Sequence, residues 1–260
     1  MSNTDPRSSR RYPPQFACLL AAGAACVIPL PAFAGRPLVI DDADPVERGG
    51  IEIEAGVQRV DEGRGEGSHW HTPVGVTLGF GVVEVGLGFG GWLEDEGDHY
   101  PCGWEDFSAG LKWRFFNGEG MWPRLAVVPS IAFPANLGQM DHPSYDGTLI
   151  ASWSLGEAAG LHANAGYGWA NGIDGEDDSV PFHFGVAVDA GLTDTLVWVG
   201  EVFAEKETNG GGDVVWEMNT GLRWEAAKNV VFDIAVGAGL SSDAPDWTAT
   251  LGVTWLLGAE

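Results

Sequence analysis

Hydrophobicity alternates along this chain with a period of two residues, and the alternation recurs from one end of the chain to the other. In residues 83–89, large apolar side chains occupy every odd position, and glutamate or glycine lies between them. The same alternation occurs in 107–115, 161–169 and 247–255. Because successive side chains of a β-strand point to opposite faces, this period predicts strands with one apolar and one polar face.

Twelve such segments follow one another, each long enough for a tilted strand to cross a bilayer, which takes about 9–11 residues. Short connections alternate with longer ones rich in Gly, Asp and Glu, an arrangement typical of outer-membrane barrels. We therefore predict an all-β fold over residues 50–257: a transmembrane antiparallel β-barrel of about 12 strands, of the Gram-negative outer-membrane type. The expected strands span roughly residues 50–59, 69–79, 82–93, 104–115, 123–133, 146–155, 160–170, 180–191, 195–205, 214–225, 229–239 and 246–257.

A soluble β-sandwich or a lipocalin-like barrel is the alternative fold, since either would bury the apolar face inside. Two observations favour the membrane barrel. Glycine accounts for 39 of the 260 residues and is frequent on the other face, where it solvates a surface poorly but leaves room inside a narrow lumen. Tryptophan gathers at the expected strand ends, as the interfacial girdles of a membrane barrel require; these residues are Trp70, Trp92, Trp104, Trp169, Trp224, Trp247 and Trp255.

Residues 1–34 have the features of a secretory signal peptide. Arginines within residues 7–11 form a basic start, residues 16–30 are mostly apolar, and Ala32-Phe33-Ala34 matches an A-x-A cleavage site. We predict cleavage after Ala34 and export to the outer membrane of a Gram-negative bacterium. The mature chain then comprises a periplasmic N-terminal segment, 35–49, the barrel, 50–257, and a C-terminal tail, 258–260. The segment 35–49 is not an obvious plug, although it is free to enter the lumen.

The chain is strongly acidic, with 37 Asp and Glu against 13 Lys and Arg. The signal contains three Arg and one Asp, so the mature chain keeps 36 acids and 10 bases. This balance excludes a nucleic-acid partner, because phosphate binding needs a basic face. Cys18 and Cys26 leave with the signal, and Cys102 alone cannot form an internal disulfide. The expected partners are the lipid bilayer with its lipopolysaccharide, the outer-membrane assembly machinery and a small-molecule solute.

Several short motifs resemble a known family. The mature chain opens with Arg36-Pro37-Leu38, Asp41-Asp42-Ala43 and Gly50–Gly56, which resemble the opening of the phenol meta-pathway degradation family of outer-membrane β-barrel transporters. The resemblance continues through His71-Thr72-Pro73, Gly79-Phe80-Gly81 and the closing segment Trp247–Trp255. It implies a signal-bearing barrel that takes up or exports small, often hydrophobic compounds.

The face opposite the apolar one is expected to line the lumen. One hypothesis is a narrow acidic channel that favours cations and neutral solutes, because rings of carboxylates select cations. The other is a structural network in which the bases pair with the acids and fill the lumen, since a barrel of about 12 strands is only moderately wider than a packed 8-stranded one. The pore candidates are Glu52, Glu54, Glu84, Asp106, Lys112, Arg114, Arg124, Asp189, Glu201, Glu217, Arg223 and Asp233.

No cofactor or metal site is predicted. The acidic loops 94–98 and 174–178 contain the oxygen ligands that Ca²⁺ prefers, but solvated surface loops are the simpler interpretation, because the second lacks the full spacing of a calcium loop. His69 and His71 lie on one expected strand face without an identifiable third ligand. Cys102 is expected in an external loop as a bystander thiol.

The sequence does not predict an enzyme. Ser152, Ser154, His162 and His183 are candidates for a rim-site hydrolase by residue type alone, and no nucleophile motif marks them. We predict an outer-membrane pore or transporter for passive passage of small solutes, hydrophobic or aromatic ones among them, through a narrow acidic lumen. A structural or adhesive barrel with a plugged lumen and no transport is the alternative.

Overall fold

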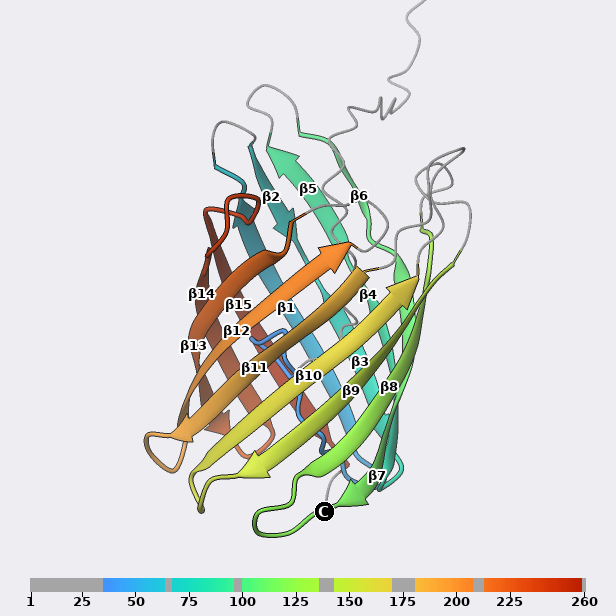
Figure 1. The fold of residues 1–260 in the computed structure, drawn as a ribbon, viewed down its shortest axis with the longest axis vertical. Helices are drawn as coiled ribbons and strands as arrows, with labels where there is room; N and C mark the ends of the chain where they lie inside the picture. Colours follow the sequence, from blue (N-terminus) through green and yellow to red (C-terminus); the bar gives the residue numbers. More distant parts are fainter. Residues whose placement is uncertain are drawn as a thin grey trace, which may run out of the picture.

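A computed structural model of the chain describes residues 35–63, 67–95, 100–135, 143–169, 181–207 and 213–258. The expected signal peptide and the loop 174–178 lie outside them. The described strands form one antiparallel sheet in which β15 also pairs with β1, so that the sheet closes into a barrel (Figure 1). Within the described part of the chain, no helix is long and apolar enough to cross a membrane.

Three of the strands that cross the barrel are each divided into two segments, so the fifteen segments make a closed barrel of twelve strands, which confirms the prediction. The segments are β1 (Ile51–Asp61), β2 (Ser68–His71), β3 (Val74–Gly79), β4 (Val83–Phe89), β5 (Gly91–Asp95), β6 (Cys102–Trp104), β7 (Phe107–Asn117), β8 (Arg124–Phe133), β9 (Ser144–Ser154), β10 (Ala159–Trp169), β11 (Pro181–Gly191), β12 (Leu196–Glu207), β13 (Val215–Ala227), β14 (Val230–Gly239) and β15 (Trp247–Leu257).

The divided strands are β2 with β3, β4 with β5, and β6 with β7, and their breaks lie next to one another in the sheet. Pro73 follows β2 and has no N–H to donate to a ladder. The side chain of Thr72 replaces the ladder locally, since its Oγ1 accepts a hydrogen bond from the N–H of Gly91 at 3.1 Å. The N–H of Thr72 in turn donates to the carbonyl of Gly91 at 2.8 Å.

The apolar face of the strands is the outer surface of the barrel. Large apolar side chains such as Tyr167 and Leu251 are more than half exposed, as expected of a face that meets lipid rather than water. Trp104 on β6 and Trp122 in the β7–β8 connection are about 70% exposed, and β6 and that connection lie toward opposite ends of the barrel. Trp92 departs from the expected girdle: it pairs with His71 and therefore lies on the lumen face.

The lumen is occupied by residues 35–49, seen as the blue segment inside the barrel in Figure 1. We call this segment the plug. Two small apolar clusters pack its side chains against the inner wall: Leu38 and Ile40 with Ala187 and Val199, and Ala43 with Ala126, Val128 and Ile150. The plug joins β1 at the end of the barrel with the short turns, which in outer-membrane barrels faces the periplasm.

Candidate functional site

The plug has no regular secondary structure, so its backbone N–H groups need side-chain acceptors. Glu201 on β12 accepts hydrogen bonds from the N–H groups of Val39 and Ile40, the latter at 2.8 Å. Glu84 on β4 accepts one from the N–H of Val46 at 2.6 Å. These two buried carboxylates therefore act as acceptors for the plug backbone from two different strands.

Arg36 anchors the beginning of the plug. Its guanidinium forms an ion pair with Asp233 on β14 at 3.4 Å, and its Nη2 donates to Oγ1 of Thr250 on β15 at 2.8 Å. Its backbone N–H donates to Glu54 on β1 at 3.2 Å. Arg223 on β13 donates from Nε to the backbone carbonyl of Arg36 at 2.6 Å. Four neighbouring strands therefore hold one end of the plug.

A buried ion-pair triad holds the middle of the plug. The Nζ of Lys112 on β7 lies 2.8 Å from Oδ2 of Asp41 and 3.3 Å from Oε1 of Glu84, and all three side chains are at most 9% exposed. Burial raises the pKa of Asp41 to about 7, although the Lys112 ammonium and its hydrogen bond oppose the rise. The Lys112 ammonium thus links the plug to β7 and to Glu84 on β4, and it offsets part of the cost of burying the Asp41 carboxylate.

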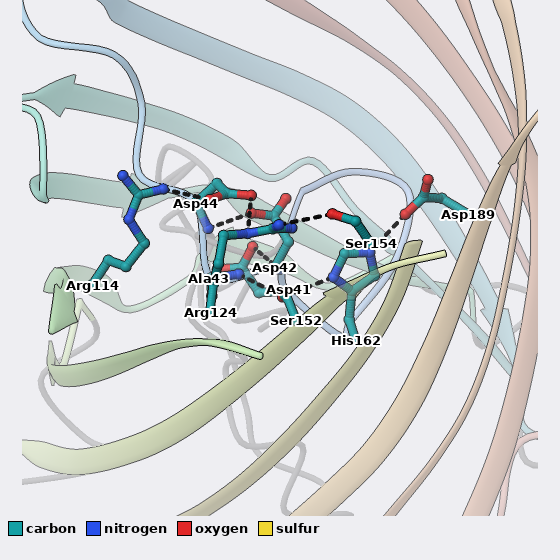
Figure 2. A network of polar contacts seen from close by, with 10 residues as sticks. All are labelled: Asp41, Asp42, Ala43, Asp44, Arg114, Arg124, Ser152, Ser154, His162 and Asp189. Atoms are coloured by element: carbon teal, nitrogen blue, oxygen red, sulfur yellow. Dashed lines mark hydrogen bonds and ion pairs between the residues drawn. The ribbon is translucent and has the colours of Figure 1, made fainter. Parts of the chain in front are cut away.

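Asp44 bridges two arginines at the wall, as Figure 2 shows. Nη1 of Arg114 on β7 donates to Oδ1 of Asp44, and Nε of Arg124 on β8 lies 2.9 Å from Oδ2. Arg124 also donates from Nη1 to Ser154 on β9 at 2.9 Å. Asp44 is about 40% exposed, so water weakens these pairs compared with the Lys112 triad.

A chain of hydrogen bonds runs from Asp189 through His162 and Ser152 to the plug (Figure 2). Oδ1 of Asp189 lies 2.6 Å from Nε2 of His162, Nδ1 of His162 lies 2.9 Å from Oγ of Ser152, and that Oγ accepts the N–H of Ala43 at 2.9 Å. Ser152 is fully buried beneath the plug. Its oxygen is already an acceptor for the plug, so in this arrangement the three side chains position the plug.

The Ser152–His162–Asp189 array lies inside the lumen on β9, β10 and β11, and not at the rim where the hydrolase alternative expects it. The remaining candidates are separated from it. His183 contacts Thr148 Oγ1 at 3.1 Å and Asp146 at 3.6 Å, and Ser154 contacts Arg124. A serine, a histidine and an aspartate therefore do meet in one array, but the plug covers the serine.

Glycines on the lumen wall make room for the plug. A Cβ atom added at Gly56 or at Gly252 would overlap the guanidinium of Arg36. A Cβ atom added at Gly79 would overlap the plug backbone at Val46. The glycine of the lumen face is thus explained at these positions by close approach of a second chain segment.

The half of the lumen toward the long loops carries carboxylates and histidines. His69 lies 3.7 Å from Glu62 and 3.9 Å from Glu94, and Nδ1 of His71 lies 2.8 Å from Glu105. Glu217 lies near the start of β13. Among the described residues, every Lys or Arg that faces the lumen contacts the plug or belongs to it, namely Arg36, Lys112, Arg114, Arg124 and Arg223. No three His, Cys, Asp or Glu of the described ranges are grouped as metal ligands.

The twelve pore candidates divide by their relation to the plug. Eight contact it directly: Glu54, Glu84, Lys112, Arg114, Arg124, Glu201, Arg223 and Asp233. Asp189 acts through His162 and Ser152. Asp106 accepts the N–H of Ala135 at 3.1 Å, while Glu52 and Glu217 share the lumen face with Glu54 and Asn219.

The partners of these residues within the plug did not emerge from the strand pattern. Arg36, Asp41 and Asp44 precede the first strand, where the period of two gives no information on position. The signal that marks them is the apolar run 38–40 inside an otherwise charged connecting segment. Such a run requires burial, and the lumen is the nearest place that offers it.

Comparisons with known proteins place the fold among outer-membrane barrels of the Gram-negative type. The chain is similar to the COG4313 outer membrane channel from Pseudomonas putida F1, with a TM-score of 0.63 and 10% identity over 83% of this chain and 98% of that one. It is similar to the NanC porin, with a TM-score of 0.58 and 10% identity over 79% of this chain and 98% of the porin chain. It is also similar to the β domain of the Bordetella autotransporter BrkA, with a TM-score of 0.51 and 11% identity over 80% of this chain and 99% of that domain.

None of the curated proteins matches the chain significantly. One protein family does: it is described as "Uncharacterised conserved protein UCP029691", and it matches residues 24–256. That range contains the plug and nearly all of the barrel. The chain therefore belongs to this family.

Proposed function

We propose that this protein is an outer-membrane channel for passive passage of small solutes, closed toward the periplasm by the plug. The observation that carries the proposal is the division of the lumen. Among the residues that the structure describes, the Lys and Arg side chains that face it are engaged with the plug, and the half toward the long loops presents Glu62, Glu94, Asp146 and Glu217 together with histidines. Among the described residues, the lumen face on that side of the plug is therefore acidic.

An acidic lumen face favours cations and neutral solutes over anions. The resemblance to the phenol meta-pathway degradation family adds small hydrophobic or aromatic compounds as solutes. A neutral aromatic compound does not oppose the negative potential, so both lines of argument are compatible with one channel. The similarity to the COG4313 channel supports a channel-like barrel at the level of the fold.

Planar-bilayer recording of the mature protein tests the proposal. Deletion of residues 36–46 should raise the conductance strongly and give a cation-selective reversal potential in a KCl gradient. Neutralisation of Glu217 should reduce that selectivity, because Glu217 faces the lumen without contacting the plug. Substitution of Glu84 or Glu201 by Ala should instead open the channel of the intact mature chain, because both side chains accept hydrogen bonds from the plug and Ala has no acceptor. A plug-deleted protein that folds, inserts and passes no current would refute the channel.

A permanently plugged structural barrel is the second candidate, and the buried Lys112 triad favours it. The two functions differ in the behaviour of the intact protein. Liposomes containing the full mature chain should take up a small aromatic solute if the plug moves in the membrane. Uptake only after plug deletion would assign the intact protein to the structural class.

A further inference from the structure

Arg59 is a cation on the outer surface of the barrel, in a position where most side chains are apolar. It pairs with Trp70 on β2 and with Ala249 on β15, and it shares the outward face of β1 with Ile53 and Val57. Its guanidinium carbon lies 5.4 Å from the ring centre of Trp70 and 5.3 Å from that of Trp247. The cation is therefore held between two indole rings.

Arg59 also lies at a characteristic depth along its strand. Arg59 is near the end of β1 that leads into the connection at 62–67, at the end of the barrel with the long loops. Trp70 and Trp247 are more than one third exposed and belong to the aromatic residues of that end. Tryptophan marks the depth of lipid headgroups, so Arg59 lies at headgroup level and not in the hydrocarbon core.

Toward the described residues, the hydrogen-bonding capacity of Arg59 is largely unused. An arginine has five N–H donors. Among the described residues, its only hydrogen bond is a long one from Nη2 to Oγ of Ser68, at 3.4 Å, and no carboxylate lies within ion-pair distance. Nε is enclosed and unpartnered. Asp61, two residues further along the same strand, accepts the N–H of Gly63 at 3.1 Å.

We propose that Arg59, clamped by Trp70 and Trp247, binds a phosphate group of the phosphorylated glycolipid of the outer leaflet, the lipid A portion of lipopolysaccharide. A guanidinium offers paired donors that match two phosphate oxygens. The two rings hold the fork in one orientation, so little side-chain entropy is lost on binding. An acidic protein repels anionic lipids in general, which makes a fixed cation at headgroup depth the natural point of contact.

The structural alternative is that Arg59 only joins β15, β1 and β2 across the closure of the barrel. The two roles differ in their dependence on phosphate. An arginine that only joins strands stabilises the barrel in any detergent. A phosphate site confers stability and lipid retention only when the phosphorylated lipid is present.

The test is native mass spectrometry of the purified mature protein in detergent, titrated with lipid A, with dephosphorylated lipid A, with phosphatidylglycerol and with inorganic phosphate. The wild type should retain lipid A in preference to the other three. R59Q should weaken lipid A binding about tenfold, as the loss of a charge-assisted hydrogen bond predicts. The matched control is K206Q, because Lys206 is an exposed outward cation at the same end, paired in the ladder with Phe182; its binding should equal that of the wild type.

Equal binding of lipid A by R59Q and the wild type would overturn the proposal, and so would equal binding of lipid A with and without phosphates. Binding of phosphatidylglycerol as tight as lipid A would overturn the glycolipid assignment. If R59Q does not fold, R59K decides: it keeps the charge and loses the paired donors, so it should bind more weakly than the wild type. Wild-type affinity in R59K would exclude recognition by the guanidinium.

Discussion

Substitution of Lys112 by Gln removes the single cation between two buried carboxylates. Lys112 lies 2.8 Å from Asp41 and 3.3 Å from Glu84, with each side chain at most 9% exposed. Removing one partner of a buried ion pair costs about 3–5 kcal/mol, because the remaining charge is left without compensation. At about 1.4 kcal/mol per factor of ten, the ratio of docked to released plug should fall by a hundredfold or more.

The effect of K112Q should depend on pH, with a sign that follows from Asp41. Burial raises the pKa of Asp41 to about 7, and the Lys112 ammonium opposes that rise, so the pKa should be higher still in K112Q. At pH 5 the Asp41 carboxyl is then neutral and needs no counter-charge. The plug should therefore be released far more by K112Q at pH 8 than at pH 5.

Single-channel recording at pH 5 and pH 8 measures the open fraction directly. K228Q is the matched control, because Lys228 is an exposed cation in the β13–β14 turn. The triple variant D41N/E84Q/K112Q should recover much of the closure, since neutral partners leave no buried charge. An open fraction at pH 8 that is the same in K112Q and the wild type would refute the role given to the triad.

Three further results are expected. In the wild type, the contribution of Asp41 to plug docking should be fully present below its ordinary pKa of 3.8 and be lost as the pH rises through about 7. The plug should therefore be better protected from protease at pH 5 than at pH 8. Equal protection at the two pH values would exclude this contribution. G252V should displace Arg36 and raise the conductance, whereas G147V, where a Cβ atom meets open space, should not. S152A should leave the N–H of Ala43 buried without an acceptor, at a cost of about 1–3 kcal/mol, and speed its hydrogen exchange; unchanged exchange would exclude the contact as an anchor.

The strands of this protein follow from its sequence because their pattern is local. The expected segment 123–133 is β8 at 124–133, and the expected segment 160–170 is β10 at 159–169. The period of two also assigns Tyr167 to the outer face and Asn164 to the inner face, where it is buried. Trp92 shows the limit of a rule based on residue type, because its register with His71 turns it into the lumen.

The candidate site was predictable only in part. That Glu84 and Glu201 face inward follows from alternation, but that they accept hydrogen bonds from Val46, Val39 and Ile40 does not, since the plug has no periodicity to place it. The two hypotheses for the lumen charges, a selective channel and a structural network, also predict the same residues on the same face. Which charged side chains contact one another depends on the path that the plug takes through the lumen.

The sequence by itself determined a barrel with an apolar exterior and an acidic, glycine-rich interior, because the alternation of side chains along a strand is a property of the strand alone. Only the tertiary structure decided that residues 35–49 lie in the lumen, that Lys112 lies between Asp41 and Glu84, and that Ser152 lies beneath Ala43. These contacts join residues far apart in the chain. They form only when the closed sheet brings all its inner faces around one narrow space, and no local pattern encodes that meeting.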